Sequence, residues 1–212
     1  CNARFLLSLA SPAPILDHVS VPLLMALLIL PDPAGDANGD GTYVLPQRPP
    51  LTADALDLRS FNATANGKKM RFTVAFGQIA NPWQAPSGFS AGVTDIFIKT
   101  GFIGSQTLAD TGLSVKNSSG WNYHLRITGF ESTLEVVGAD GSVRPLASPT
   151  ISIEGTSLVI DADLPSGHYG YWVTNSLYSP LSATGVIAPK VNTDSVSTDP
   201  TALQAGSANL PT

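Results

Sequence analysis

The chain has 212 residues, of which 43% are hydrophobic and only 13% are charged, against about 25% charged residues in an average soluble domain. Its net charge of −5 and the lack of any run of Lys or Arg exclude nucleic acid as a partner, because nothing would neutralise the phosphates. The 19 Gly and 17 Pro favour a turn-rich β structure over helices. One core domain with flanking segments accounts for this length.

Cys1 is the single cysteine, so the chain forms no intrachain disulfide. A cysteine in first position is typical of a mature bacterial lipoprotein, in which it carries the lipid. Cys1 is therefore our candidate for lipid attachment and membrane anchoring. The alternatives are an arbitrary sequence boundary and a retained signal peptide around residues 4–10, which also points to export.

Residues 21–30 form the most apolar run of the sequence and include Pro22. This run is shorter than the ~20 residues that a helix needs to cross a bilayer. It predicts a strand buried on both faces. A membrane-inserted or partner-covered segment is the alternative.

An acidic loop at residues 32–43 follows this run and has the spacing of a cation site. In Asp36-x-Asn38-x-Asp40-Gly41, alternate side-chain oxygens converge on a hard cation while the glycine takes a sharp turn. The twelfth position is Gln47 rather than a bidentate Glu, so the loop is not an EF-hand. The alternative is a solvated turn whose side chains bond their own backbone. The candidate calcium ligands are Asp32, Asp36, Asn38 and Asp40.

Two alternating runs at residues 57–63 and 70–79 flank an Asn66-Gly67 turn and predict a β-hairpin. The apolar residues that share one face of the second run are Met70, Phe72, Val74 and Phe76. We expect this face to be buried in the core.

Further short strands, separated by turn signals, predict an all-β, antiparallel β-sandwich of jelly-roll or immunoglobulin-like type. They are expected at residues 93–99, 121–129, 133–137, 150–154, 157–162 and 168–174. The expected organisation is an irregular N-terminal segment at 1–20, a single sandwich domain at 21–187 and a flexible, low-complexity tail at 188–212. The tail has too few large apolar residues to offset the entropy of ordering it.

The segment Gly88-Phe89-Ser90-Ala91-Gly92 matches the G-x-S-x-G nucleophile pattern, and Asp163 and His168 follow in the order of a hydrolase. That pattern requires a strand before the serine and a helix after it. Here a Pro-rich loop precedes Ser90 and a strand follows it. A serine hydrolase is therefore the least favoured reading, and we name no catalytic residue.

Aromatic residues offer a platform on which sugar rings stack against π faces. Trp83 lies in a Pro-rich loop and is the best candidate for a solvent-facing role. In the alternating run 121–129, Trp121 and Tyr123 share a face with Leu125 and Ile127, so burial in the core is the alternative for both. The candidate ligand-binding residues are Trp83, Phe89, Trp121, Tyr123 and Trp172.

Several of these motifs together resemble one family, the C-terminal binding module of glucodextranase and amylopullulanase-type proteins, a DOMON-like β-sandwich. The resemblance covers residues 27–180. It rests on Asp32-Pro33-Ala34-Gly35-Asp36, Gly39-x-Gly41-Thr42-Tyr43, Ala55-Leu56-Asp57-Leu58, Asn81-Pro82-Trp83 and Pro86-x-Gly88-Phe89-Ser90. It implies an extracellular, non-catalytic module that binds carbohydrate or holds its protein at the cell surface.

The leading interpretation is an exported accessory protein of a bacterial cell envelope or surface layer, on the outer surface or in the periplasm. It is expected to bind a surface glycan or an envelope protein without catalysis, with calcium in a structural role. The alternative is a carbohydrate-binding module that recognises polysaccharide through its aromatic platform.

Overall fold

The computed structural model describes residues 28–37, 51–66, 69–100, 104–108, 113–114, 120–164 and 169–186. Within these ranges the chain is mostly strand, with a short 3-10 turn at Ala53–Ala55. The predicted N-terminal segment at 1–20 and the tail at 188–212 lie outside the described residues, as do Cys1, Asn38 and Asp40.

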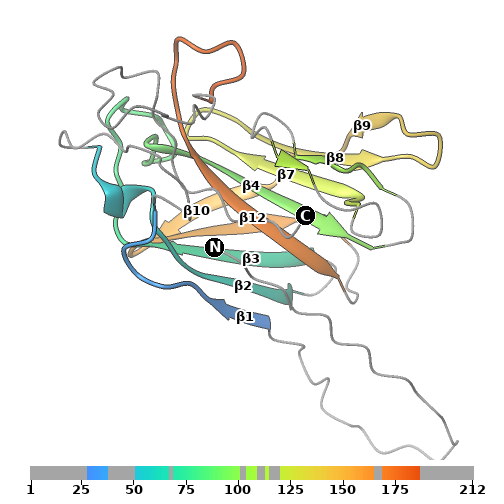
Figure 1. Cartoon of the computed structure of the whole chain (residues 1–212), viewed down its shortest axis with the longest axis horizontal. Coiled ribbons are helices and arrows are strands. Elements are labelled where there is room, and N and C mark those ends of the chain that lie inside the picture. Colours follow the sequence, from blue (N-terminus) through green and yellow to red (C-terminus); the bar gives the residue numbers. More distant parts are fainter. Residues whose placement is uncertain are drawn as a thin grey trace, which may run out of the picture.

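Two five-stranded antiparallel sheets form the described part of the domain, and Figure 1 shows them as two layers. The first sheet has the order β1 (Leu28–Pro31), β2 (Leu58–Asn66), β3 (Lys69–Phe76), β11 (Ser157–Ala162) and β10 (Thr150–Glu154). The second has the order β12 (Gly170–Leu177), β4 (Gly92–Lys99), β7 (Tyr123–Ile127), β8 (Ser132–Val137) and β9 (Val143–Pro145). A small ladder of β5 (Thr107–Leu108) and β6 (Leu113–Ser114) lies between β4 and β7 in sequence. The predicted antiparallel β-sandwich is confirmed.

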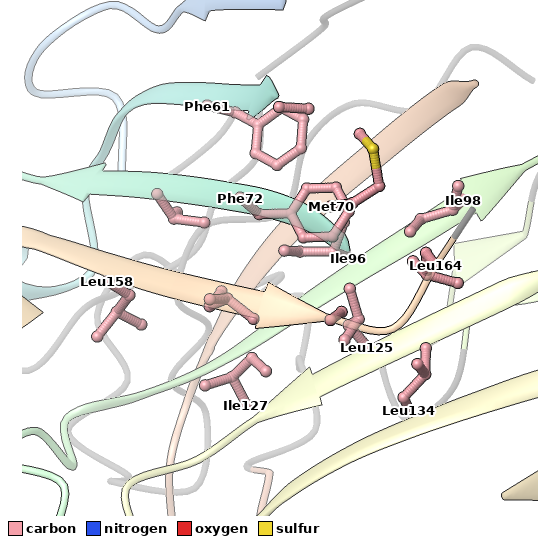
Figure 2. Close-up of a cluster of buried hydrophobic side chains, with 14 of the residues drawn as sticks. Phe61, Met70, Phe72, Ile96, Ile98, Leu125, Ile127, Leu134, Leu158 and Leu164 are labelled. Atoms are coloured by element: carbon pink, nitrogen blue, oxygen red, sulfur yellow. The ribbon is translucent and has the colours of Figure 1, made fainter. Parts of the chain in front are cut away.

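The core lies between the two sheets and follows from the period-two alternation of their strands. In β3 the alternate residues from Met70 to Phe76 are at most 5% exposed, as the hairpin pattern predicted. Figure 2 shows Phe61 and Phe72 of the first sheet facing Ile96, Ile98 and the side chains of β7 from the second. The fully buried members of this cluster are Phe72, Val74, Ile96, Ile98, Leu125, Ile127, Leu134, Leu158, Ile160 and Ala162.

For residues 21–30, the structure describes only the last three, where the predicted strand is present but its predicted burial on both faces is wrong. The strand Leu28–Pro31 lies at the edge of the first sheet, where it pairs with β2 alone. An edge strand buries one face, so Leu30 packs on the core while Ile29 is 56% exposed. Pro31 lacks the N–H that would continue a ladder.

The prediction that Trp121 shares a face with Tyr123 is also wrong. Tyr123 packs on the core between the sheets, whereas Trp121 packs against Phe97 on the outer face of the second sheet. The physical reason is that the regular strand begins only at Tyr123. Trp121 instead forms a bridge with Ser105, and its indole nitrogen donates a hydrogen bond to the carbonyl of Thr107 (2.9 Å).

Truncation of Phe72 to alanine should lower the free energy of unfolding by about 3–5 kcal/mol, because the fully buried ring leaves a cavity between the sheets. Phe130→Ala is the matched control, since that ring is 48% exposed, and it should cost roughly 1 kcal/mol or less. Urea unfolding of both variants measures the difference. Equal losses would contradict the core assignment.

Candidate functional site

The segments that carry the family motifs meet at one end of the sandwich. The pairs Pro31↔Ser60 and Leu58↔Phe76 bring the end of β1, the start of β2 and the end of β3 together. The pair Leu177↔Gly92 brings the start of β4 next to the end of β12. We call residues 32–37, 51–57, 77–91, 128–131 and 178–186 the loop end.

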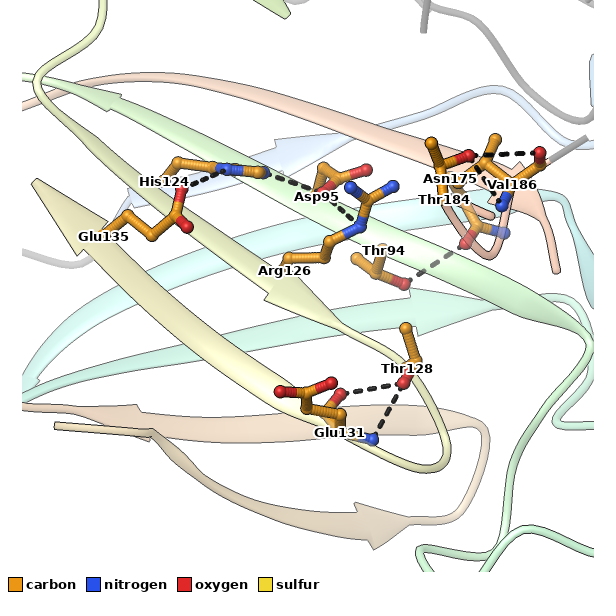
Figure 3. Close-up of polar contacts among 10 residues, drawn as sticks. All are labelled: Thr94, Asp95, His124, Arg126, Thr128, Glu131, Glu135, Asn175, Thr184 and Val186. Atoms are coloured by element: carbon orange, nitrogen blue, oxygen red, sulfur yellow. Dashed lines mark hydrogen bonds and ion pairs between the residues drawn. The ribbon is translucent and has the colours of Figure 1, made fainter. Parts of the chain in front are cut away.

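Asn175 joins the two sheets at the loop end. Its Nδ2 donates to the carbonyl of Leu56 (3.2 Å), and its Oδ1 accepts from the hydroxyl of Thr94 (3.2 Å; Figure 3). Both Asn175 and Thr94 are 1% exposed. A Cβ at Gly92 would collide with the Asn175 amide, so the glycine makes room for this link. Buried hydrogen bonds of this kind fix the relative positions of the loops.

The Trp83 loop is held by two polar side chains, Asn81 and Ser90. The Asn81 Nδ2 donates to the carbonyl of Ala85 (3.0 Å), while its Oδ1 accepts from the Ala85 N–H (2.8 Å) and the Ser90 hydroxyl (2.7 Å). The Ser90 Oγ in turn accepts from the Trp83 N–H (2.9 Å). Because Ser90 is fully buried, this small network fixes the backbone on both sides of Trp83.

The Trp83 side chain is 44% exposed, although the loop beneath it is tightly held. The next residue, Gln84, has φ 52°, the only positive φ among the non-glycine residues that the structure describes. A left-handed backbone at such a residue is strained and persists where its surroundings enforce it. The loop therefore presents an indole ring to solvent in a fixed position.

Phe89 closes this loop by inserting into the core, where it is 4% exposed. Ser87 fastens the same segment to the turn before β8, because its N–H and its hydroxyl both donate to the carbonyl of Gly129. A side chain at Gly129 would collide with the Phe89 carbonyl. Phe89 is thus an anchor of the loop, which corrects its prediction as a ligand-facing residue.

A second aromatic group, absent from the sequence-based candidates, lies next to the Trp83 loop. The ring of Phe130 is 48% exposed and packs on Tyr178, with ring centroids 5.4 Å apart. The Tyr178 N–H donates to the carbonyl of Ala91 (3.0 Å), which fastens this pair to the end of the Trp83 loop. The available sequence signal was an aromatic residue inside the Thr128–Glu131 turn, where packing within a strand cannot explain it.

The other predicted platform residues lie at the opposite end of the sandwich. Ile98 pairs with Tyr123 and Phe97 with Trp172, several residues along β4 from the loop end. Trp121 is 4% exposed there and packs with Phe97 and Trp172. The five predicted aromatic residues therefore do not form one platform, and of these only Trp83 belongs to the loop end as an exposed ring.

The hydrolase arrangement does not exist among the described residues. Ser90 is buried at the loop end with its hydroxyl engaged by Asn81 and Trp83. Asp163 follows β11 at the other end, where it pairs with Lys69 (3.5 Å). His168 lies outside the described residues. Ser90 is thus a structural residue of the loop.

A buried polar network crosses the outer face of the second sheet (Figure 3). His124 Nε2 lies 2.7 Å from Asp95 Oδ1, and its Nδ1 lies 3.7 Å from Glu135 Oε2. Arg126 Nε lies 3.6 Å from the same Asp95 oxygen. The His124 ring also stacks on Phe97 at 4.4 Å. These contacts join β4, β7 and β8, so we assign the network a structural role.

The acidic loop packs against a buried carboxylate, Asp57, which is 1% exposed. Its Oδ2 accepts from the Gly35 N–H (2.8 Å) and pairs with Arg59 Nη2 (2.8 Å). Burial raises the pKa of Asp57, opposed by the Gly35 bond and by Arg59. Burial, and then the negative charge of Asp36, raise the pKa of Asp32 to about 6.

Within the described ranges, no group of three or more His, Cys, Asp or Glu side chains is already arranged to hold a metal ion. Two of the predicted calcium ligands, Asn38 and Asp40, lie outside those ranges. In the same part of the chain, no helix is long and apolar enough to cross a membrane.

One family model matches the chain. It describes the C-terminal binding module, SLH-like, of glucodextranase, and it matches residues 27–174. The chain belongs to this family. The match confirms the resemblance and covers most of the loop end, including the acidic loop and the Trp83 loop. The comparison with curated proteins gave no match.

Membership of the glucodextranase binding-module family indicates a non-catalytic, surface-binding role. The geometry of Ser90 agrees with this role. Its hydroxyl donates a hydrogen bond to Asn81 and accepts one from the Trp83 N–H, so it stabilises the loop. The fold and the family thus point to binding at the cell surface.

Replacement of Ser90 by alanine should lower the free energy of unfolding by about 1–3 kcal/mol, because it removes a fully buried hydroxyl that bonds both Asn81 and the partly buried Trp83 N–H. Urea unfolding measures the loss. Ser148→Ala is the control, since Ser148 is exposed, and it should change stability by about 0.5 kcal/mol or less. Hydrolysis of a simple ester that Ser90→Ala abolishes would contradict the structural role.

Replacement of Asp32 by asparagine should raise the melting temperature at pH 7 in the presence of chelator. Asp32 ionises less readily in the folded protein than in the unfolded chain, so its charge destabilises the fold at pH 7. This penalty decreases as the pH falls below about 6, and most of it is lost by pH 4, where Asp32 is protonated in the folded protein while the carboxyl in the unfolded chain is close to its ordinary pKa of 3.8. The increase in melting temperature caused by Asp32→Asn should therefore become smaller as the pH falls.

Thermal unfolding at pH 7 and pH 4 measures the effect. Asp163→Asn is the control with the same change in net charge, and it should show no such pH-dependent gain. A gain from Asp32→Asn that is the same at both values would show that the charge of Asp32 is not its cause.

Proposed function

We propose that the module binds a glycan of the cell envelope or surface layer through its loop end, with Trp83 as the principal contact. The observation that carries this proposal is an exposed indole on a loop that Asn81 and Ser90 hold in one conformation. The SLH-like description of the family supports a location on the extracellular side of the cell surface.

Exposed aromatic rings suit sugars because the apolar face of a pyranose stacks on a π face. Trp83 is 44% exposed, so packing in the core accounts for only part of its surface and the rest is open to a ligand. A preorganised loop also lowers the entropy that binding has to overcome. These properties favour a ligand that is recognised by a rigid ring rather than by a loop that folds around it.

The Phe130–Tyr178 pair extends this apolar surface beside the Trp83 loop. The segment after Tyr178 adds the hydroxyls of Ser179, Ser182 and Thr184, which bond within this loop and have further lone pairs that can accept from sugar hydroxyls. Aromatic rings beside small polar groups are the usual chemistry of a sugar site.

An envelope or surface-layer protein is the second candidate partner. Leu181 favours it, because this side chain is 95% exposed in the same loop as Tyr178. A protruding aliphatic side chain contributes little to a sugar but inserts well into an apolar pocket of a protein. Anchoring through Cys1 and a bacterial source remain predictions from the sequence.

Trp83→Ala should weaken binding to isolated cell-wall polysaccharide by at least about tenfold, or ~1.4 kcal/mol. Pull-down followed by calorimetric titration measures the loss. Trp83→Phe keeps a ring and should retain most of the affinity, while Val143→Ala on the exposed β9 should bind as wild type. Thermal unfolding must first show that each variant is folded.

Unchanged polysaccharide binding by Trp83→Ala would overturn the proposed site. Leu181→Ala separates the two partners: it should leave glycan binding intact. If instead Leu181→Ala abolishes retention on a purified surface-layer protein while no polysaccharide binds saturably, the partner is a protein.

A further inference from the structure

In the part of the loop end that the structure describes, Oδ1 of Asp57 and Oδ2 of Asp32 are buried carboxylate oxygens without a hydrogen-bond donor. They belong to segments 25 residues apart in the chain. Asp57 is 1% exposed, so bulk water does not solvate its orphan oxygen. A buried anionic acceptor without a donor is costly, so a cation bound beside it would stabilise the folded chain.

The backbone holds these two carboxylates close to each other. The Asp32 N–H donates to the carbonyl of Arg59 (2.9 Å), and the Gly35 N–H donates to Asp57 Oδ2 (2.8 Å). The described start of the acidic loop is thus fastened beside β2 at Asp32 and at Gly35. Because Gly35 and Arg59 both engage Oδ2 of Asp57, its Oδ1 is left for another partner.

The local charge is unbalanced. After burial, the negative charges of Asp36 and Asp57 both raise the pKa of Asp32, and the guanidinium of Arg59 opposes them. Arg59 also lies 3.3 Å from Asp54, so its charge is shared with a further carboxylate. Among the described residues, a single guanidinium thus stands beside several carboxylates in a partly buried site, which favours binding of an additional cation.

We propose that the loop end binds a calcium ion, with Asp57 Oδ1 and Asp32 Oδ2 as its side-chain ligands. Calcium accepts six to eight oxygen ligands in flexible geometry, and main-chain carbonyls and water complete its shell. The site therefore needs no cluster of three side chains. No nitrogen or sulfur ligand belongs to the pair, which argues against zinc or copper.

This site differs from the one that the sequence spacing predicted. Asp57 directly precedes β2, well beyond the acidic loop, and its burial makes it the fixed half of the site. The ion would tie the loop at 32–37 to the second strand. It would act on the stability of the loop end and is independent of whether Trp83 binds a glycan.

Calorimetric titration and thermal unfolding of the chelator-treated, full-length chain test the proposal. Extracellular calcium modules have dissociation constants of about 10⁻⁴–10⁻³ M, so about 10 mM calcium chloride should raise the melting temperature by roughly 3–10 °C. Magnesium at the same concentration should produce a clearly smaller shift. Chelator should reverse the effect.

Asp32→Asn should abolish the calcium-dependent shift and the binding heat. Asp54→Asn is the matched control, because Asp54 is acidic and contacts Arg59 but is exposed, and it should respond as wild type. Asp57→Asn removes a buried ion pair with Arg59 and is titrated with calcium only if it remains folded. The test of the proposed ligands therefore rests on comparing Asp32→Asn with Asp54→Asn.

Absence of calcium binding by the wild-type chain would overturn the proposal. Equal responses of Asp32→Asn and wild type would overturn it too, since the ion would then bind elsewhere, and so would loss of the response in Asp54→Asn. Glycan binding measured in chelator is unaffected by any of these outcomes, so failure of the calcium site and failure of the glycan site are distinguishable.

Discussion

Burial of two sheet faces against each other is the constraint on which the rest of this molecule depends. Phe72 and Ile160 of one sheet and Ile96 and Leu125 of the other are fully buried between the layers. Because strand pairing is antiparallel throughout, this packing gathers the connecting segments at the two ends of the sandwich. The loop end is a product of that arrangement.

Polar side chains then fix the conformation of the loops at the loop end. Asn81 and Ser90 fix the Trp83 loop, Asn175 joins the segment before β2 to the second sheet, and Asp57 fastens the acidic loop. Each of these groups is buried or half-buried, so each is effective because water does not compete for its bonds. The exposed aromatic rings therefore lie on loops that are held rigidly against the β-sandwich.

Alternation made much of the fold predictable. The pattern from Met70 to Phe76 specified which side chains face the core, and Asn66-Gly67 marked the turn of the hairpin. Alternation failed at Trp121, because a pattern of residues does not reveal where a regular strand begins. It also overstated the burial of Ile29, since position at a sheet edge depends on partners that lie far away in sequence.

The sequence by itself determined the sandwich, the family and the exposed role of Trp83, because these follow from local periodicity and from motif order. Only the tertiary structure decided which residues share a site. It separated Trp121 and Trp172 from Trp83, paired Phe130 with Tyr178, and brought Asp57 to the acidic loop. The physical reason is that strand register and the packing of two sheets are long-range properties, and they set which distant segments become neighbours.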